Sequence, residues 1–203
     1  LITDGQYRQP EQIVEMAQYI NDAGARLYRL TENYLAYAQL EAMMTNREWT
    51  SVLQSYSTFD PSMIVQDTAL QKAQIVDREA DLTLRLHAKA TARVLSDHLK
   101  KMTEELVDNA FKFSRQGTPV EVETNADGGQ FHLMVSDHGR GMTPEQIAAV
   151  GAYMQFGRKW FEQQGLGLGL IITRRLSELY GGTTSIESHP DQLTRITVTL
   201  PLA

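Results

Sequence analysis

The sequence contains no cysteine among its 203 residues. Disulfide bonds, thiol catalysis and cysteine-bound metal sites are therefore excluded. A long hydrophobic run is also absent: the most apolar stretch, 166–172, is short and interrupted by glycine, whereas a helix that crosses a bilayer needs roughly 20 apolar residues. We therefore expect no membrane contact from these residues and a cytoplasmic location, whether or not a parent protein is anchored in a membrane.

Basic residues are outnumbered by acidic ones, 19 against 25, and the formal net charge is −6. A protein that binds nucleic acid through its overall electrostatic field needs an excess of basic residues, so no nucleic-acid partner is expected. Hydrophobic residues make up 42% of the chain, which is enough for a folded core. Because the chain begins with Leu1 and has no signal-like segment, we interpret it as a fragment of something longer.

An apolar seam with steps of three and four residues runs along the N-terminal part of the chain. This spacing is typical of a long helix in a dimeric four-helix bundle, although a helix packed only on its own domain remains an alternative. Residues 43–59 continue the amphipathic pattern as far as Asp60, which is expected to cap a helix whose first residue is Pro61. We place a domain boundary there, between 1–59 and 60–203. The seam consists of Ile13, Met16, Ile20, Ala23, Leu27, Leu30, Tyr34 and Tyr37.

Two periodicities alternate after this boundary. Period-two alternation predicts strands, and spacing of three and four residues predicts helices. Thr143, Pro144 and Gln146 have the pattern of a capping box at the start of a further helix. Strands in hairpins with helices between them predict an α+β fold, a two-layer sandwich preceded by the long coiled-coil-type helix. The expected strands are 82–86, 120–123, 131–135, 184–188 and 194–200, and the expected helices are 95–113 and 168–180.

The first segment suited to ligand binding lies in the predicted helix 95–113. Glu105, Asn109 and Lys112 are spaced by four and then three residues, so they share one face. An amide oxygen suits Mg²⁺ and an ammonium group suits phosphate. Such a strip is, however, more often a solvated helix edge.

A second segment, Asp137-His138-Gly139-Arg140-Gly141, follows the strand 131–135. Its carboxylate offers an acceptor for a ligand donor, and its glycines let a flat ring approach the backbone. A turn that merely leaves the sheet is the alternative.

The third segment, 165–170, has the sequence GLGLGL and leads directly into a helix. Successive glycine N–H groups at a helix N-terminus favour a polyphosphate, although a bulged strand is the alternative. The segment differs from the lysine-bearing phosphate loop and from the dinucleotide fingerprint, because no Lys-Ser/Thr pair follows it and no βαβ unit surrounds it.

In this order the three segments resemble the ATP-binding domain shared by sensor histidine kinases and by the gyrase, heat-shock and mismatch-repair ATPases. Residues 98–114 resemble the histidine-kinase N-box, 137–142 the first glycine box and 165–170 the second. Phe156 and Arg158 resemble the F-box.

The resemblance implies a Bergerat ATP-binding fold, in which ATP lies between a mixed sheet and helices. Asn109 would hold Mg²⁺, with Glu105 as a second metal ligand, and Lys112 would meet phosphate; these three would be the catalytic residues. Asp137 would accept a hydrogen bond from the adenine amino group, and Gly141 would pack near the base. The remaining nucleotide contacts would come from Gly139, Phe156, Arg158, Gly165, Leu166, Gly167, Leu168, Gly169 and Thr194.

Residues 13–41 resemble the second helix of the dimerisation and phosphoacceptor domain of the same kinases. The implied function is transfer of the γ-phosphoryl group of ATP to a histidine, for relay to the receiver domain of a response regulator. The implied assembly is a homodimer joined by a four-helix bundle. None of the five histidines has a His-Glu-x-x-x-Pro setting, so the acceptor is expected upstream of Leu1 and this fragment should bind ATP without phosphorylating itself.

Two positions depart from the usual histidine-kinase pattern. Glu105 stands where many members have Asn and where hydrolysing relatives have a base, so an ATPase in which Glu105 activates water is an alternative function. Leu193 stands where a glycine usually precedes the threonine, which would reshape the adenine end slightly. A non-catalytic ATP-binding signalling module is the third hypothesis.

Overall fold

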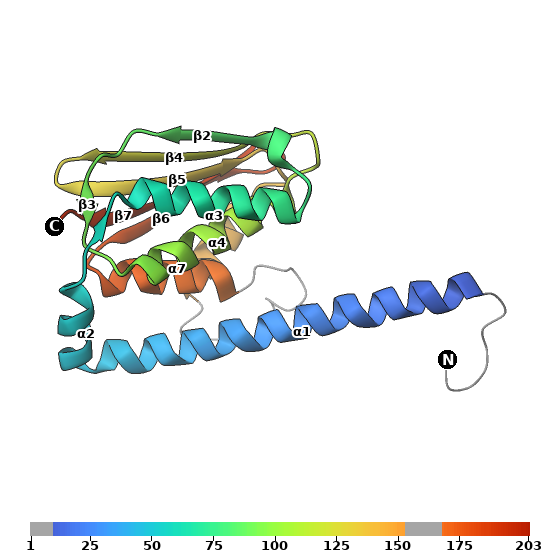
Figure 1. Ribbon diagram of the computed structural model, residues 1–203, viewed down its shortest axis with the longest axis horizontal. Helices are drawn as coiled ribbons and strands as arrows, with labels where there is room; N and C mark the ends of the chain where they lie inside the picture. Colours follow the sequence, from blue (N-terminus) through green and yellow to red (C-terminus); the bar gives the residue numbers. More distant parts are fainter. Residues whose placement is uncertain (1–9, 153–167) are drawn as a thin grey trace.

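The computed structural model describes residues 10–152 and 168–203. A long helix, α1 (Pro10–Thr45), runs beside a body in which helices cover one face of a β-sheet (Figure 1). The C-terminal half of α1 lies against the helical layer, and its N-terminal half extends beyond it. The predicted α+β two-layer sandwich with a preceding long helix is confirmed.

The remaining elements include every strand and helix expected from the sequence. The helices are α2 (Arg47–Gln54), α3 (Pro61–Ile75), η1 (Glu79–Asp81), α4 (Ser96–Phe113), α5 (Pro144–Ala152) and α7 (Leu168–Leu179). The strands are β1 (Thr58–Phe59), β2 (Leu82–Leu86), β3 (Thr91–Ala92), β4 (Val120–Asp127), β5 (Gln130–Asp137), β6 (Thr183–His189) and β7 (Leu193–Pro201). Of these, α2 as a separate helix, η1, β1 and β3 were not expected.

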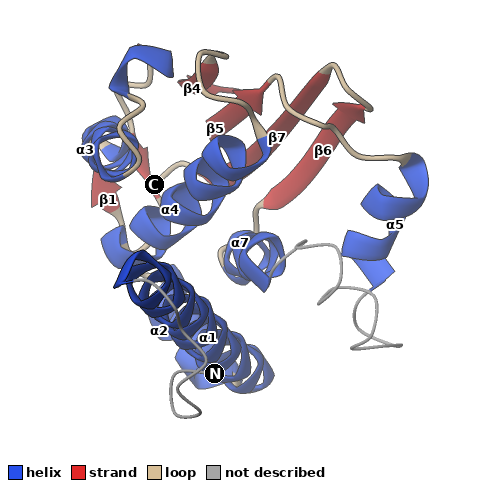
Figure 2. Cartoon of the chain, turned by 90° about the vertical axis from the view of Figure 1, so that its right-hand side faces the viewer, coloured by secondary structure: helices blue, strands red, loops and turns tan. Residues whose placement is uncertain are grey.

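The main sheet has the strand order β2-β4-β5-β7-β6. It is mixed, because β2 and β4 are parallel and the other neighbours are antiparallel. Alternate residues of β4, β5 and β7 are buried, as the period-two pattern predicts. The buried face is covered by α3, α4 and α7, and α5 lies at the β6 edge (Figure 2).

Helix α4 occupies the centre of the helical layer. Its apolar stripe, which includes Leu99, Met102 and Leu106, is almost entirely inaccessible to solvent. Burial of this stripe against the sheet fixes the rotation of the helix. The face beside the stripe, which carries Asn109, is thereby set at the margin between core and solvent.

Two helix starts test the predicted caps. At α5, the Thr143 N–H donates to Gln146 Oε1 at 2.8 Å and the Gln146 N–H donates to Thr143 Oγ1 at 3.3 Å, so the capping box is confirmed. At α3, Pro61 takes the first turn as predicted, but Asp60 has a left-handed backbone (φ 48°) and makes no side-chain cap hydrogen bond. The prediction of an Asp60 side-chain cap is therefore wrong, since capping side chains usually need extended backbone at this position.

The predicted amphipathic continuation of 43–59 is interrupted. Helix α1 ends at Thr45, and the Asn46 side chain accepts from the N–H groups of Glu48 and Trp49, which starts α2 as a separate helix. The chain then forms β1, which pairs with β3 in a small two-stranded sheet that the sequence did not predict.

Helix α1 contacts the body through one side only. Asn33 and Leu40 are buried there, and Arg175 Nε of α7 lies 2.8 Å from Glu41 Oε1. Part of the predicted seam is exposed instead: 65% of Leu27 and 53% of Tyr34 remain accessible, whereas Tyr37 packs partly buried against the core. Within the two described ranges, none of the helices combines the length and apolarity that a membrane span requires.

Candidate functional site

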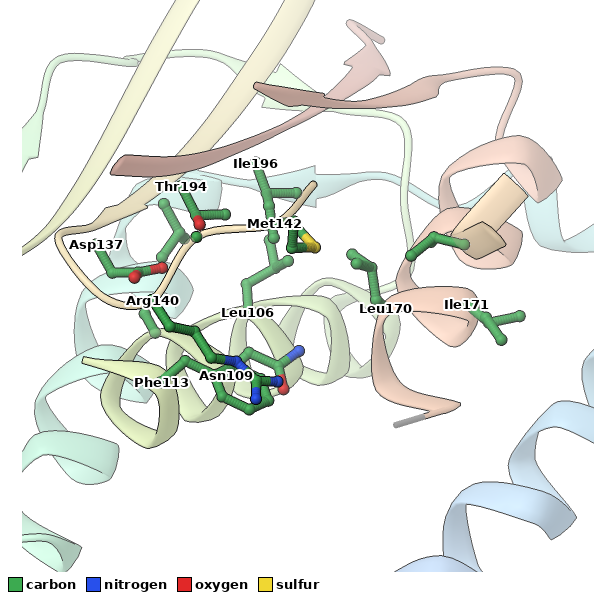
Figure 3. A pocket seen from close by; sticks show the side chains of 14 residues that line it. Leu106, Asn109, Phe113, Asp137, Arg140, Met142, Leu170, Ile171, Thr194 and Ile196 are labelled. Atoms are coloured by element: carbon green, nitrogen blue, oxygen red, sulfur yellow. The ribbon is translucent and has the colours of Figure 1, made fainter. Parts of the chain in front are cut away.

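A pocket opens between α4, the ends of β5 and β7, and the start of α7 (Figure 3). The space between atoms in and at the mouth of the pocket, open solvent included, is about 640 Å³. Four residues predicted from separate parts of the sequence line it, namely Asn109, Asp137, Gly141 and Thr194. The other lining residues are Leu106, Ala110, Phe113, Val135, Arg140, Met142, Val150, Leu170, Ile171 and Ile196.

The closed end of the pocket is polar. Asp137 and Thr194 are each only 7% exposed, and their strands place them directly opposite each other. The Thr194 hydroxyl lies 2.9 Å from Ser188 Oγ, and Ser188 Oγ also accepts from the Met142 N–H at 2.8 Å. These contacts fix the Thr194 hydroxyl on the strand position opposite Asp137.

Burial dominates the electrostatics of Asp137. It raises the pKa of this carboxyl from the ordinary value of 3.8 to about 6. The N–H of Gly139, which donates to Asp137 Oδ1 at 2.9 Å, and the nearby His138 lower the pKa and offset part of this shift. Near neutral pH the pocket therefore presents a buried carboxylate that is able to accept a hydrogen bond.

The glycines of the Asp137 segment allow close backbone packing. A Cβ on Gly139 would overlap the Phe113 carbonyl at the end of α4. Gly141 has φ +65°, and a Cβ there would overlap the carbonyl of His189, the last residue of β6. Both glycines thus allow the loop after β5 to pack directly against neighbouring backbone. The sequence predicts that their lack of a side chain serves the approach of a flat ring, and it does not predict this packing role.

The other end of the pocket is cationic. In Figure 3 the Arg140 side chain extends beside Asn109 and Phe113. The Arg140 guanidinium carbon lies 4.2 Å from the centroid of the Phe113 ring, and Lys112 Nζ lies 5.0 Å from the same centroid. Burial, followed by the charges of Arg29 and Arg140, lowers the pKa of Lys112.

Lys112 and Glu105 do not line this pocket. They line an adjacent groove on the same face of α4, which we call the α1 groove because α1 forms one wall. Glu105 is bound there by Lys101, whose Nζ lies 2.6 Å from Glu105 Oε1. The α1 groove is lined by Ala25, Tyr28, Arg29, Glu32, Asn33, Lys72, Ile75, Val76, Arg78, Lys101, Glu104, Glu105, Asp108, Phe111 and Lys112.

The second glycine box is described only where it enters α7. Leu168 packs partly buried against the core, and Gly169 lies against the Glu105 carboxylate, where a Cβ would overlap Glu105 Oε2. The other predicted nucleotide contacts, Phe156, Arg158, Gly165, Leu166 and Gly167, lie outside the described residues.

Sequence reasoning missed the apolar walls of the pocket. Val135 and Ile196 occupy alternating buried positions of their strands, as core residues do, and Leu106 belongs to the buried stripe of α4. A hydrophobic pocket wall and a hydrophobic core have the same pattern, so the sequence offers no sign to separate them. The arrangement suits a flat, largely apolar group with a hydrogen-bond donor at one end and an anionic group at the other.

Comparisons with known proteins agree with this geometry. The model of the family described as "Histidine kinase-, DNA gyrase B-, and HSP90-like ATPase" matches residues 95–203. Histidine protein kinase DivJ of Caulobacter vibrioides is 29% identical over 200 residues, which are 95% of this chain and 32% of DivJ. Sensor protein SrrB of Staphylococcus aureus is 24% identical over 204 residues, which are 98% of this chain and 34% of SrrB. The chain therefore spans about a third of the length of these relatives.

Solved structures share the fold. Histidine kinase AdeS of Acinetobacter baumannii superposes with a TM-score of 0.69 at 18% identity, over 99% of this chain and 89% of that protein. Full-length ShkA in complex with AMPPNP gives a TM-score of 0.69 at 21% identity, over 98% of this chain and 41% of ShkA. The family match covers more than half of the chain and includes every residue of the pocket. The chain thus belongs to the histidine kinase-, DNA gyrase B- and HSP90-like ATPase family, and it corresponds to the ATP-binding catalytic core of sensor histidine kinases.

Proposed function

We propose that this chain binds Mg²⁺-ATP in the pocket and donates the γ-phosphoryl group to a histidine on a separate segment, for relay to a response-regulator receiver domain. The observation that supports this most directly is the convergence of Asn109, Asp137, Gly141 and Thr194 on one pocket of an ATPase-family fold. None of the chain's own five histidines lies in the acceptor motif.

The two ends of the pocket support a specific orientation of ATP. The adenine amino group donates to the Asp137 carboxylate beside Thr194, and the ring packs between the apolar walls. The phosphates then extend toward Asn109 and Arg140, and Lys112 approaches them from the α1 groove. Phosphoryl transfer in such a site depends mainly on positioning and on neutralising charge.

The pocket offers one protein ligand that is suited to Mg²⁺, the Asn109 side chain. Mg²⁺ commonly takes one or two protein oxygens and completes its shell with phosphate oxygens and water. The Asn109 side chain offers such an oxygen at the pocket margin. Among the described residues no group of three or more His, Asp or Glu side chains could hold a metal by itself. Mg²⁺ bound by Asn109 would neutralise phosphate charge.

The contacts of Glu105 favour a supporting role over metal binding or activation of water. Its carboxylate is paired with Lys101 and lies outside the pocket lining. To act as a metal ligand or as a base for hydrolysis, it would have to leave this ion pair. Phosphotransfer is therefore better supported than the gyrase-type ATPase alternative.

We further propose that residues 1–59 belong to a dimerisation region and 60–203 to the catalytic domain. The exposed seam of α1 supports a homodimer, because apolar residues such as Leu27 and Tyr34 remain uncovered by the chain's own body. A second copy of the helix would cover them in a four-helix bundle.

A transfer assay tests the proposal. The chain is incubated with Mg²⁺ and γ-labelled ATP, together with a separate polypeptide that carries a dimerisation helix with a His-Glu-x-x-x-Pro motif. We expect acid-labile label on that histidine, and much less label with the Asp137→Asn variant at an ATP concentration near the dissociation constant of the unchanged chain. Stoichiometric hydrolysis without transfer would favour the ATPase alternative, and ATP binding without either reaction would favour the non-catalytic module.

A further inference from the structure

A chain of polar contacts connects α1 with the start of α7 through α4. Asn33 is buried although most of α1 is exposed, and its Oδ1 accepts a hydrogen bond from Lys101 Nζ at 3.0 Å. The same Nζ lies 2.6 Å from Glu105 Oε1, one turn further along α4. Lys101 is therefore shared between the long helix and Glu105.

Glu105 carries the chain of contacts to α7. Its side chain is only 13% exposed. Its carboxylate occupies the space that a side chain at position 169 would need, since a Cβ on Gly169 would overlap Oε2. Gly169 lies in the first turn of α7 and belongs to the glycine segment 165–170 that is predicted to hold phosphate. The Glu105 carboxylate is therefore in direct contact with the start of α7.

The charge of Glu105 is expected to affect the binding of phosphate at the start of α7. The start of a helix favours negative charge, so the Glu105 carboxylate and an incoming phosphate compete for the same environment at α7. Lys101 neutralises the carboxylate and holds it toward α4. Without the ammonium group, an uncompensated buried carboxylate would face the phosphate chain and weaken its binding.

We propose that Lys101 is a positioning residue that couples the docking of α1 to nucleotide binding: Asn33 holds Lys101, Lys101 holds Glu105, and Glu105 sets the start of α7. This inference rests on the proposed binding of ATP in the pocket. Because coupling between two binding events is reciprocal, a bound nucleotide also strengthens the contact of α1 with the body.

Affinity for a non-hydrolysable ATP analogue with Mg²⁺, measured by calorimetry, tests the first half. We expect Lys101→Met to weaken binding by about fivefold or more, the lower end of usual coupling effects. Asn33→Ala should weaken it less, and Lys101→Arg should restore most of the affinity. Lys72→Met is the matched control, because it removes an ion pair to α4 (Lys72 Nζ to Asp108 Oδ2, 3.0 Å) without contacting Glu105.

The reciprocal effect is measured on α1. Since the chain has no cysteine, an Ala36→Cys variant carries a single thiol on α1, at a position partly buried against the body. We expect the analogue to slow maleimide labelling of this thiol, and to lose that effect when Lys101→Met or Asn33→Ala is added. A general loss of stability would speed labelling without making it insensitive to nucleotide.

The outcomes separate the two proposals. If the unchanged chain binds no ATP analogue, the proposed function fails and the coupling fails with it. If the chain binds the analogue but Lys101→Met behaves like Lys72→Met, or labelling at position 36 ignores the nucleotide, only the coupling is overturned. If Lys101→Met does not fold, Asn33→Ala on α1 provides the same test, because it breaks the contact between α1 and Lys101.

Discussion

Asp137 of β5 and Thr194 of β7 are cross-strand partners, and both side chains face the pocket. Residues directly opposite in an antiparallel pair point to the same side of the sheet. A slip of β7 by one residue against β5 would turn Thr194 to the opposite face of the sheet from Asp137. The ladder that builds the core therefore also sets the polar end of the site.

The first prediction concerns the Asp137 carboxylate. Asp137→Asn keeps the shape of the side chain but replaces a charged acceptor, and a hydrogen bond to a charged group contributes about 1.5–3 kcal/mol. We expect ATP to bind roughly 10- to 100-fold more weakly by calorimetry. Asp127→Asn, at the exposed end of the same hairpin, is the control and should leave the affinity unchanged. Equal affinities for the two variants would contradict the assigned role of Asp137.

The raised pKa of Asp137 predicts a pH dependence. Its pKa is 3.8 in an ordinary environment and about 6 in the fold, so the folded state binds the proton more tightly than the unfolded state. The contribution of this group to stability is therefore greatest below pH 4 and is lost as the pH rises through 6. We expect the stability of the unchanged chain relative to Asp137→Asn to fall over this window, as measured by urea unfolding without nucleotide.

ATP affinity should show the opposite trend with pH. The proposed hydrogen bond from adenine requires the ionised carboxylate, which is depleted below pH 6 because the pKa of Asp137 is about 6. We expect affinity for ATP to fall from pH 7 to pH 5 in the unchanged chain, and to fall less in Asp137→Asn. A variant that keeps the full pH dependence would place the responsible group elsewhere, including on ATP itself.

Two glycines with similar backbone angles provide a further comparison. Gly141 (φ +65°) lies against the His189 carbonyl, whereas Gly128 (φ +51°) has open space where a Cβ would be. Asn tolerates the left-handed conformation better than most residues. We therefore expect Gly141→Asn to lower the free energy of unfolding by about 1–3 kcal/mol through overpacking. Gly128→Asn should change it by about 0.5 kcal/mol or less in the same denaturation assay.

Local patterns predicted most of the elements, because the periodicity of a helix or strand is a property of adjacent residues. The capping box at Thr143 and the hairpin at Gly128 were found in this way. The pairing of β1 with β3 was not found. Each of these strands has only two residues, and the pairing joins Thr58–Phe59 to Thr91–Ala92, which lie far apart in the sequence. Strands this short have no periodicity to detect.

The site was predicted less completely than the fold. Glu105, Asn109 and Lys112 share one face of α4, as their spacing requires, yet Asn109 lines the pocket and the other two line the α1 groove. Successive helical residues are about 100° apart, so Asn109 is rotated by only about 40° from Glu105. Which neighbour covers each side of this face depends on where α1 and the loop after β5 pack, and helical spacing does not determine that.

The seam of α1 leads to a prediction about assembly. Leu27 is 65% exposed in the single chain and lies on the heptad spacing, so it should be covered in a homodimer. We expect Leu27→Glu to shift the chain toward monomer in sedimentation equilibrium. Gln18→Glu adds the same charge off the seam, also at an exposed position of α1, and should leave the dimer intact. A dimer that persists with Leu27→Glu would show that the interface lies elsewhere.

Arg78 supplies hydrogen-bond donors to the C-terminal end of α4. Its Nη1 donates to the Phe111 carbonyl at 2.8 Å and its Nη2 to the Arg115 carbonyl at 2.7 Å, while Nε donates to Asp81 Oδ2 at 2.6 Å. The side chain is 6% exposed. Carbonyl groups at a helix end have no partner within the helix, so a buried end depends on such donors.

The final prediction follows from this arrangement. Arg78→Met removes every one of these donors and leaves the buried carbonyl groups without them, so we expect a loss of about 3–5 kcal/mol in urea unfolding. Asp81 loses its ion pair but keeps the hydrogen bond from the Gly117 N–H to Oδ2 at 3.0 Å. Arg78→Lys keeps the charge but cannot present the planar fork, and it should recover only part of the loss. Phe113, at the same end of α4, accepts the Arg140 N–H and packs against Gly139. Because a displaced α4 end would move Arg140 and Gly139 together, ATP affinity in Arg78→Lys should fall even at temperatures where the variant is fully folded.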